Sequence, residues 1–456
     1  MKKTILSLTH CLTTAFVALW LIMPCSVNAD DHVMAATSSN NQQTKKVETL
    51  NLSLRQAQDY AVEGNRTLRN ASLAVQEAYA QRWQTIAAML PSVDGSYSYS
   101  NYLGYSATMS TAMGSFNIDM PNVGALGVTA SIGVNGQGIV GVLLNNIAID
   151  MKKIALEQTE TELRASVRTA YVSLLVLQDI AQLLDSSLVN IETLADMTQQ
   201  TVNAGAAEQT TADQIKVRIN TLRTNIQNNK YNIELATNSM RVLLAVPAET
   251  KINLTENIEQ LLSAEAVMEQ LAANYNINNN LNYQLLVKST ELAERNVHMA
   301  GWAYGPTVSL AYNYTNQQYY GEGGMRMTPP NVVQVSVRMP LWSSGKRAAG
   351  VVEKKIAYEE AKNTLAETTE NLDIQYQQLR FNLQNAYETY MNEKENIDVT
   401  KRVFASTTNK FRWGTASNLE LTNASNDLIS AESTYVQAVL SLVNAQVELD
   451  KFLNNK

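Results

Sequence analysis

Two copies of one residue pattern follow each other along this chain. Residues 91–99 read PSVDGSYSY and residues 306–314 read PTVSLAYNY, which share the proline, the valine and both tyrosines. Asn65 and Asn280 are separated by the same interval. Because a duplicated sequence folds as two similar units, an account of the first copy must also hold for the second.

A second matched pair lies further along each copy. Gly205 and Gly414 correspond, and a leucine follows each at the same distance. The sequence therefore predicts two repeats joined by a linker. The predicted boundaries are 50–246 for the first repeat, 247–264 for the linker and 265–456 for the second repeat.

The later part of each repeat carries apolar residues at every seventh position, which is typical of helices that supercoil along a narrow seam. A helix from about 146 to 203 would extend on the order of 85 Å at about 1.5 Å per residue, longer than most globular helices. Gly205 and Gly414 then mark the tips of two helical hairpins, because glycine favours the left-handed conformation that ends a helix. Shorter helices are predicted at about 53–90 and 265–303. Heptads alone would also fit an ordinary helical bundle.

Between the shorter helix and the hairpin of each repeat, the apolar period changes to two, which predicts strands. Each alternating run is the return strand of a pair whose outgoing strand begins at Pro91 or Pro306. Tyr102, Tyr105, Tyr319 and Tyr320 cluster near the loop ends. The apolar positions of the return strands are Leu126, Val128, Ile132 and Val134 in the first repeat, and Val333, Val335 and Val337 in the second.

The apolar faces of these strands carry no charge, and aromatic residues lie near their ends, as in the lipid-facing wall of a membrane barrel. Four strands cannot close a barrel, and unpaired backbone is excluded from hydrocarbon. The chain is therefore expected to form a homotrimer with twelve strands in contact with membrane lipid. A small soluble antiparallel sheet would show the same alternation in any one strand.

The N-terminus has the features of a secretory signal peptide. Lys2 and Lys3 precede an apolar run, and residues 27–29 (VNA) are small at the cleavage positions, so 1–29 is the predicted leader. Both cysteines, Cys11 and Cys25, lie within it, and lipidation at Cys25 is the alternative processing. Residues 30–49 are polar and predict a flexible segment. After the leader, no apolar run is long enough for a membrane-spanning helix, so any crossing must use strands.

Composition and motifs exclude other function classes. The formal net charge of −7 and a pI near 5.3 argue against nucleic acid as a partner. His32 and His298 are separated and form no metal cluster, and no phosphate loop or nucleophile elbow occurs. We expect no enzymatic activity, metal or cofactor. Gly136, Gly138 and Gly141 are predicted to relax the crossing from strand to helix.

These segments, in this order and twice over, resemble the TolC-type outer-membrane efflux proteins across nearly the whole mature chain. Residues 411–414 (FRWG) through 418–421 (NLEL) resemble the second hairpin tip of that family. Pro340, Leu341, Trp342 and Gly345 resemble its strand-to-helix junction, where an aromatic residue precedes glycine and basic residues.

The resemblance implies a mainly α fold with a membrane β part. Three subunits would form one twelve-stranded β-barrel and a hollow periplasmic helical tunnel, whose far end meets an adaptor protein. The tips at Gly205 and Gly414 would dock the adaptor, which connects the channel to an inner-membrane pump. The expected location is the outer membrane of a Gram-negative bacterium.

The resemblance also places a periplasmic constriction near the hairpin tips, where acidic side chains form rings. Glu420 matches one acidic position, and Asn423 stands at the next. Where the family's type member closes its tips with polar contacts, this chain has Phe411 and Ala416 facing Thr210 and Thr211, so closure would rest on apolar packing and on Glu420. Three clustered carboxylates would raise each other's pKa and favour cations. In the alternative interpretation, Glu420 is simply an exposed acid in the first turn of a helix, where the helix dipole favours a negative charge.

The sequence thus predicts a passive exit channel for drugs or other small molecules delivered by the pump through the adaptor. Two alternatives remain, a periplasmic coiled-coil scaffold and an exit duct for type I protein secretion.

Overall fold

The computed structural model describes residues 49–454 except 112–113, 206–207, 274 and 321–328. The predicted leader and nearly all of the predicted flexible segment lie outside the described residues. The described residues belong to one unit defined by its internal contacts.

The elements of the first repeat run from a short strand to a long helical hairpin. They are β1 (Thr49–Leu52), α2 (Leu54–Gly64), α3 (Arg66–Ala87), β2 (Ser92–Ser100), β3 (Ser106–Thr111), β4 (Gly114–Asp119), β5 (Asn122–Asn135), α4 (Gly136–Asn203) and α5 (Gln209–Leu243).

The second repeat has the same order of main strands and long helices, with the short helices α6, η1 and η2 added and without a counterpart of the β3–β4 hairpin among the described residues. Its elements are β6 (Lys251–Leu254), α6 (Ile258–Leu261), α7 (Ala264–Ala272), η1 (Ile277–Asn279), α8 (Leu281–Gly301), η2 (Trp302–Tyr304), β7 (Thr307–Tyr320), β8 (Asn331–Arg338), α9 (Lys346–Arg412) and α10 (Asn418–Leu453).

The predicted shorter helices are interrupted by asparagines, so the continuous helices expected at 53–90 and 265–303 are wrong. Asn65 ends α2 and caps α3 by accepting from the amides of Thr67 and Leu68. Asn280 separates η1 from α8 and accepts from the amide of Tyr283 at 3.1 Å. An asparagine side chain satisfies helix-start amides while its own backbone stays extended, so the helix breaks there.

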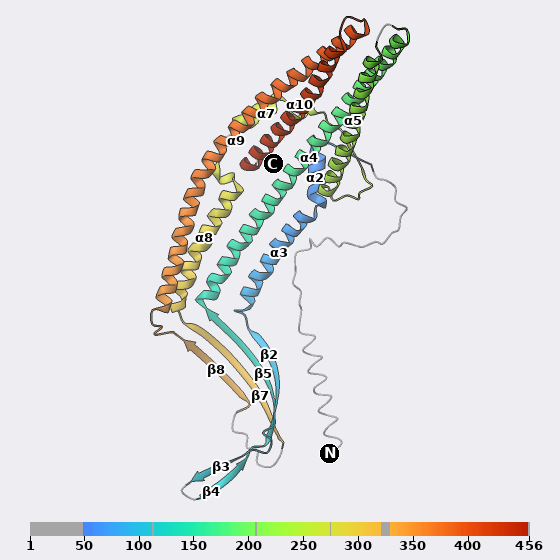
Figure 1. Ribbon diagram of the computed structural model, residues 1–456. Coiled ribbons are helices and arrows are strands. Elements are labelled where there is room, and N and C mark those ends of the chain that lie inside the picture. Colours follow the sequence, from blue (N-terminus) through green and yellow to red (C-terminus); the bar gives the residue numbers. More distant parts are fainter. Residues whose placement is uncertain (1–48, 112–113, 206–207, 274, 321–328, 455–456) are drawn as a thin grey trace. The chain divides into compact units, whose positions relative to one another are not determined.

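Strands of both repeats form one antiparallel sheet in the order β2-β5-β7-β8, here called the long sheet. The β5–β7 pairing joins the two repeats, from Asn122 opposite Tyr320 to Asn135 opposite Thr307. In Figure 1 the four strands lie side by side, and β2 and β8 are the edges. The two strand pairs expected from the alternation therefore combine into a single sheet.

The long helix of the first repeat follows β5 without a loop, earlier than the expected start near 146. The side chain of Asn135 accepts from the amide of Gly138 at 2.7 Å and caps α4. A Cβ on Gly136 would lie 2.1 Å from the ring of Trp302, and one on Gly138 would lie 2.8 Å from the sulfur of Met89. The glycines therefore permit close packing inside the first turns of α4, and their expected role in relaxing the crossing from strand to helix stays a prediction.

The hairpins α4–α5 and α9–α10 form the longest part of the helical region (Figure 1). Their seams contain the predicted heptad positions, including Leu184, Ile191 and Leu222 in the first hairpin and Leu421 and Leu428 in the second. Helix α10 also packs against α4, so the two hairpins share one apolar cluster near their tips.

A second core lies where the short helices meet the hairpins. Tyr171 on α4 is fully buried and donates its hydroxyl to the carbonyl of Leu52 in β1 at 3.0 Å. Strand β1 pairs in parallel with β6, which lies in the predicted linker. The first strand of one repeat is thereby tied to the first strand of the other.

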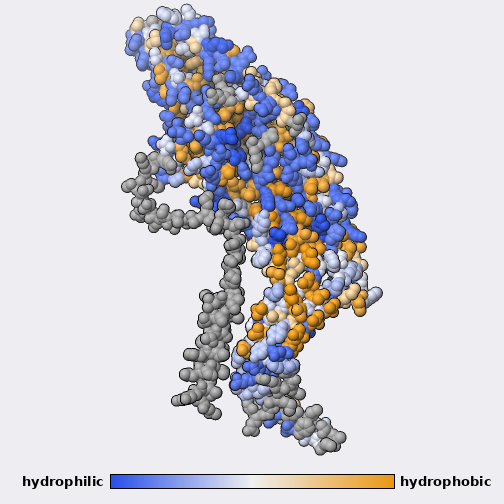
Figure 2. All heavy atoms as spheres, turned by 180° about the vertical axis from the view of Figure 1, so that it is seen from behind, coloured by the Kyte–Doolittle hydropathy of each residue, from blue (hydrophilic) through white to orange (hydrophobic). Residues whose placement is uncertain are grey.

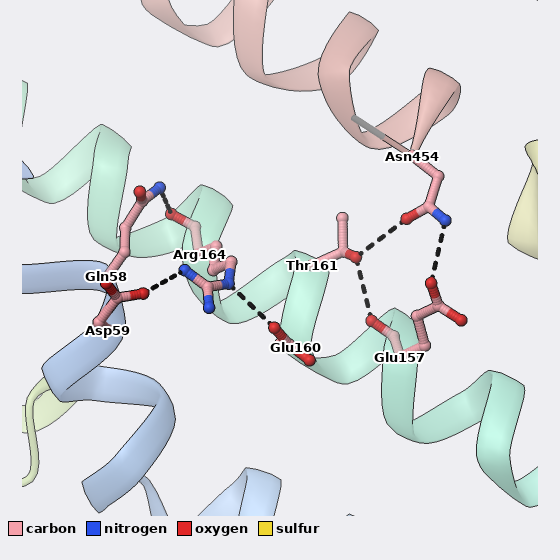
Figure 3. Close-up of polar contacts among 7 residues, drawn as sticks. All are labelled: Gln58, Asp59, Glu157, Glu160, Thr161, Arg164 and Asn454. Carbon is pink, nitrogen blue, oxygen red and sulfur yellow. Dashed lines mark hydrogen bonds and ion pairs between the residues drawn. The ribbon is translucent and has the colours of Figure 1, made fainter. Parts of the chain in front are cut away.

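Polar contacts connect this region to the C-terminus, as Figure 3 shows. Arg164 on α4 contacts Asp59 of α2 at 2.9 Å and Glu160 of its own helix at 3.0 Å. Asn454 donates to Glu157 at 3.1 Å and accepts from Thr161 at 3.4 Å. Helix α4 is thus held on one side by α2 and on the other by the end of α10.

Candidate functional site

The long sheet has one apolar and one polar face. The register places Tyr97 opposite Leu126, Val128 opposite Tyr314 and Leu310 opposite Val335, so these side chains share a face. Every strand residue predicted to face lipid lies on this face, and all are exposed except the half-buried Ile132: Leu126, Val128, Ile132, Val134, Val333, Val335 and Val337. Figure 2 shows hydrophobic residues concentrated over the strands and the adjoining helix ends.

The opposite face of the long sheet is polar. Thr129 donates to Asn313 at 2.9 Å across the β5–β7 pair, and Ser309 lies opposite Ser336 across the β7–β8 pair. The face also carries Asp94 and Arg338. A sheet that is polar on one face and apolar on the exposed other face has the polarity of a barrel wall around a water-filled passage.

The strand-to-helix junction exposes two large apolar side chains. Leu341 and Trp342 are 87% and 86% exposed between β8 and α9. Gly345 has φ +82 and precedes the first residue of α9, a conformation that favours glycine. Arg347 donates to the carbonyl of Pro340 at 2.7 Å, which folds the junction back onto the start of α9.

Both predicted tip glycines follow the ends of the long helices and have positive φ, +75 at Gly205 and +71 at Gly414. The amide of Gly414 donates to the carbonyl of Phe411 and that of Thr415 to Lys410, both at 2.9 Å. This pair of bonds satisfies the last carbonyls of α9 and needs a left-handed residue between them. Beside the second tip, Trp413 and Leu419 are 80% and 68% exposed.

Glu420 belongs to the N-terminal cap of α10. Its carboxylate accepts from the Ser417 amide at 2.6 Å and from the Ser417 hydroxyl at 3.0 Å, and the Glu420 amide donates to the Ser417 hydroxyl at 3.2 Å. The bonds from the Ser417 backbone and side chain lower the pKa of Glu420, and Lys410 lowers it further. Within one subunit, Glu420 is therefore the helix-start acid of the alternative interpretation.

The other predicted constriction residues divide into two groups. Phe411, Ala416 and Thr211 line one hollow between the tips, together with Leu194 and Thr198 of α4. Thr210 does not line this hollow, and its hydroxyl donates to the carboxylate of Glu208 at 3.0 Å. Asn423 is exposed on α10.

A cavity between the hairpins was not predicted from the sequence. A cavity of about 80 Å³ is lined by Ser187 of α4, Arg218 of α5, Phe404 of α9 and Glu432 of α10. The sequence signal that could have located it is a heptad row on α10 that contains polar residues. The row consists of Ser425, Glu432, Val439 and Gln446, which lie seven residues apart, and all four are buried.

In the part of the chain that the structure describes, no group of histidine, cysteine and acidic side chains could hold a metal ion. Among the same residues, α4 is the one helix long and apolar enough to span a membrane by composition. Helix α4 packs against α3, α5, α8 and α10, and 33% of its most apolar stretch is buried in the structure.

The two repeats match a known family in two segments, residues 58–246 and 259–455, which is most of the chain. The chain belongs to the outer membrane efflux protein family. This membership confirms the resemblance to TolC-type proteins and locates the protein in the outer membrane of Gram-negative bacteria, with its helices in the periplasm. The family consists of channels.

Three solved structures of outer membrane efflux proteins illustrate the shared fold. CusC has a TM-score of 0.69 at 16% identity, covering 91% of this chain and 95% of that one. VceC from Vibrio cholerae has 0.68 at 14% identity, covering 88% and 96%. The MtrE channel of Neisseria gonorrhoeae has 0.68 at 15% identity, covering 91% and 94%. No curated protein sequence matched.

Proposed function

We propose that three copies of the chain form a single twelve-stranded barrel and a continuous periplasmic tunnel, through which substrate leaves the cell passively. The observation that carries this proposal is the long sheet, whose exposed face is uncharged and apolar while its edge strands β2 and β8 each pair on one side only among the described strands. Unpaired backbone is costly in hydrocarbon, so the edges must pair with other copies.

The polar face of the long sheet would then line the barrel. Strands β5 and β8 lead into α4 and α9, so the passage continues between the helical hairpins. Nucleotide-binding and proton-relay motifs were not found in the sequence, which supports a passive duct driven by its partners.

The tips at Gly205 and Gly414 are proposed to dock a periplasmic adaptor, which links the channel to an inner-membrane pump. Support comes from Trp413 and Leu419, large apolar side chains that remain exposed beside the second tip. Aromatic residues of this kind commonly anchor protein interfaces.

The substrates are proposed to be drugs or other small molecules. At the tips, three symmetry-related Glu420 carboxylates would surround the exit and favour cations. The lowered pKa of Glu420 keeps the group ionised at neutral pH, which this selectivity requires.

A pair of arginine substitutions at adjacent positions tests the membrane proposal. Val335 lies on the apolar face and Ser336 on the polar face of the same strand. Val335→Arg is expected to cost about 2–4 kcal/mol near the membrane midplane, and trimer should disappear from outer membranes. Ser336→Arg, which would point into water, should assemble like the wild type.

Equal assembly of both variants in the membrane would contradict a lipid-facing β8. Recovery of the wild-type chain as a water-soluble protein would instead support the scaffold alternative.

A further inference from the structure

Glu432 is an acidic side chain enclosed between the two helical hairpins. It is 6% exposed and lines the cavity of about 80 Å³ where α4, α5, α9 and α10 meet. The structure gives its carboxyl group no hydrogen-bond partner among the described residues. A buried carboxylate without a partner is costly, whereas the neutral acid is tolerated.

The positively charged groups around Glu432 compensate the negative charge of its carboxylate only weakly. From α9, Lys401 lowers the pKa of Glu432, but burial has the larger effect and raises it to about 7. From α5, Arg218 lines the same cavity, and its guanidinium donates to the Leu421 carbonyl at 3.2 Å. The lining residues of α4 are Leu184, Ser187 and Ile191, which carry no charge.

The duplicated hairpins differ at this position. In α10 the row Ser425, Glu432, Val439 and Gln446 is buried, and α10 packs against α4. In α5 the corresponding row contains Lys216, Arg223 and Lys230, all exposed. The buried acid is therefore a feature of the contact between hairpins rather than of the repeat.

We propose that the cavity around Glu432 is a proton-controlled joint between the α4–α5 and α9–α10 hairpins, closed when Glu432 is protonated and loosened when it ionises. Separation of the hairpins admits bulk water, which solvates the carboxylate more fully than the small cavity of the closed joint does. Because this contact lies toward the tips, loosening would widen the periplasmic exit. The regulatory role rests on the proposed channel function, while the titration of the joint does not.

The sign of the pH effect follows from proton linkage. Glu432 binds a proton more tightly in the closed joint, where its pKa is about 7, than in water, where the ordinary value is 4.5. The closed joint is most stable below pH 4.5 and loses stability as pH rises toward 7. The opening constant should rise about tenfold per pH unit in this window, by about 300-fold in total, and then level off.

Hydrogen exchange of the full chain in detergent tests the joint without requiring conduction. Amide exchange in residues 184–191 and 425–432 would be measured from about pH 5 to 8 and corrected for the intrinsic rate. The wild type should lose protection as pH rises. Glu432→Gln, which keeps the shape without the charge, should abolish the pH dependence, and Asp427→Asn, an exposed acid on the same helix, should leave it unchanged.

A second variant keeps the proposal falsifiable if Glu432→Gln misfolds. Lys401→Met removes the cation that lowers the pKa of Glu432, so the loss of protection should extend to higher pH. Unchanged pH dependence in Glu432→Gln, or a midpoint in Lys401→Met equal to that of the wild type, would overturn the joint. A pH-dependent joint in a protein that conducts nothing in bilayers would instead contradict the channel function.

Discussion

The side-chain amide of Asn280 donates to the backbone carbonyl of Phe452 at 2.9 Å. The first repeat contains the equivalent bond, from Asn65 to the carbonyl of Leu243 at 3.1 Å. In each repeat, one asparagine caps the helix leading to the strands and also holds the end of the hairpin's second helix. The duplication therefore preserves a long-range contact as well as a sequence pattern.

Replacement of Asn280 by alanine should destabilise the second repeat. The residue is 3% exposed, so the substitution removes a helix cap and leaves the Phe452 carbonyl without this donor. We expect a loss of about 2 kcal/mol in the free energy of unfolding, measured by thermal denaturation in detergent. Asn282→Ala, at an exposed position on the same helix, serves as the control and should change it by less than about 0.5 kcal/mol. Similar losses in both variants would contradict the role of Asn280.

Gly136→Ala should disturb the start of α4, because the added methyl group would lie 2.1 Å from the Trp302 ring. Overpacking of this kind costs about 1–3 kcal/mol, so the yield of folded protein should fall. Gly141→Ala is the matched control, since its nearest neighbour would be Thr85 at an ordinary 3.4 Å. Trp302→Leu should restore folding of Gly136→Ala, and failure of this rescue would show that the contact is not the cause.

Two variants separate the charge of Glu420 from its capping role. Glu420→Gln can keep the bonds to Ser417 and removes the charge, so it should reduce cation selectivity without loss of stability. Ser417→Ala breaks the cap and keeps the charge, so it should cost about 1 kcal/mol with selectivity retained. Reversal potentials in planar bilayers under a salt gradient measure the selectivity. An unchanged reversal potential in Glu420→Gln would leave the residue with its capping role alone.

The long elements could be predicted from the sequence because their patterns extend over many residues. The seven-residue apolar repeat predicted the hairpins whose tips lie near Gly205 and Gly414. The alternation of apolar and polar residues predicted an apolar face of the strands, and Leu126 and Val335 lie on that face of the long sheet. The role of that face toward lipid and the role of the tips toward an adaptor remain predictions.

The missed features depend on tertiary contacts. Glycine weakens helices, so the start of α4 at Gly136 could not be foreseen without the Trp302 ring that packs against it. The β3–β4 hairpin has no clear apolar alternation, and its strands pair with each other rather than with the long sheet. Glu432 resembles any exposed helical acid until the neighbouring hairpin is placed over it.

The most direct test of the account is covalent linkage of the edges of the long sheet. Both cysteines of the sequence lie in the predicted leader. Each test variant would carry one cysteine in place of Ser96 of β2 and a second at one position within 333–337 of β8. These two would be the only thiols of the mature chain. If three copies close one barrel, a matching pair should oxidise in outer membranes to a ladder that ends at a covalent trimer under denaturing conditions. A ladder that continues beyond three chains, or monomer at every scanned position, would contradict closure by three subunits.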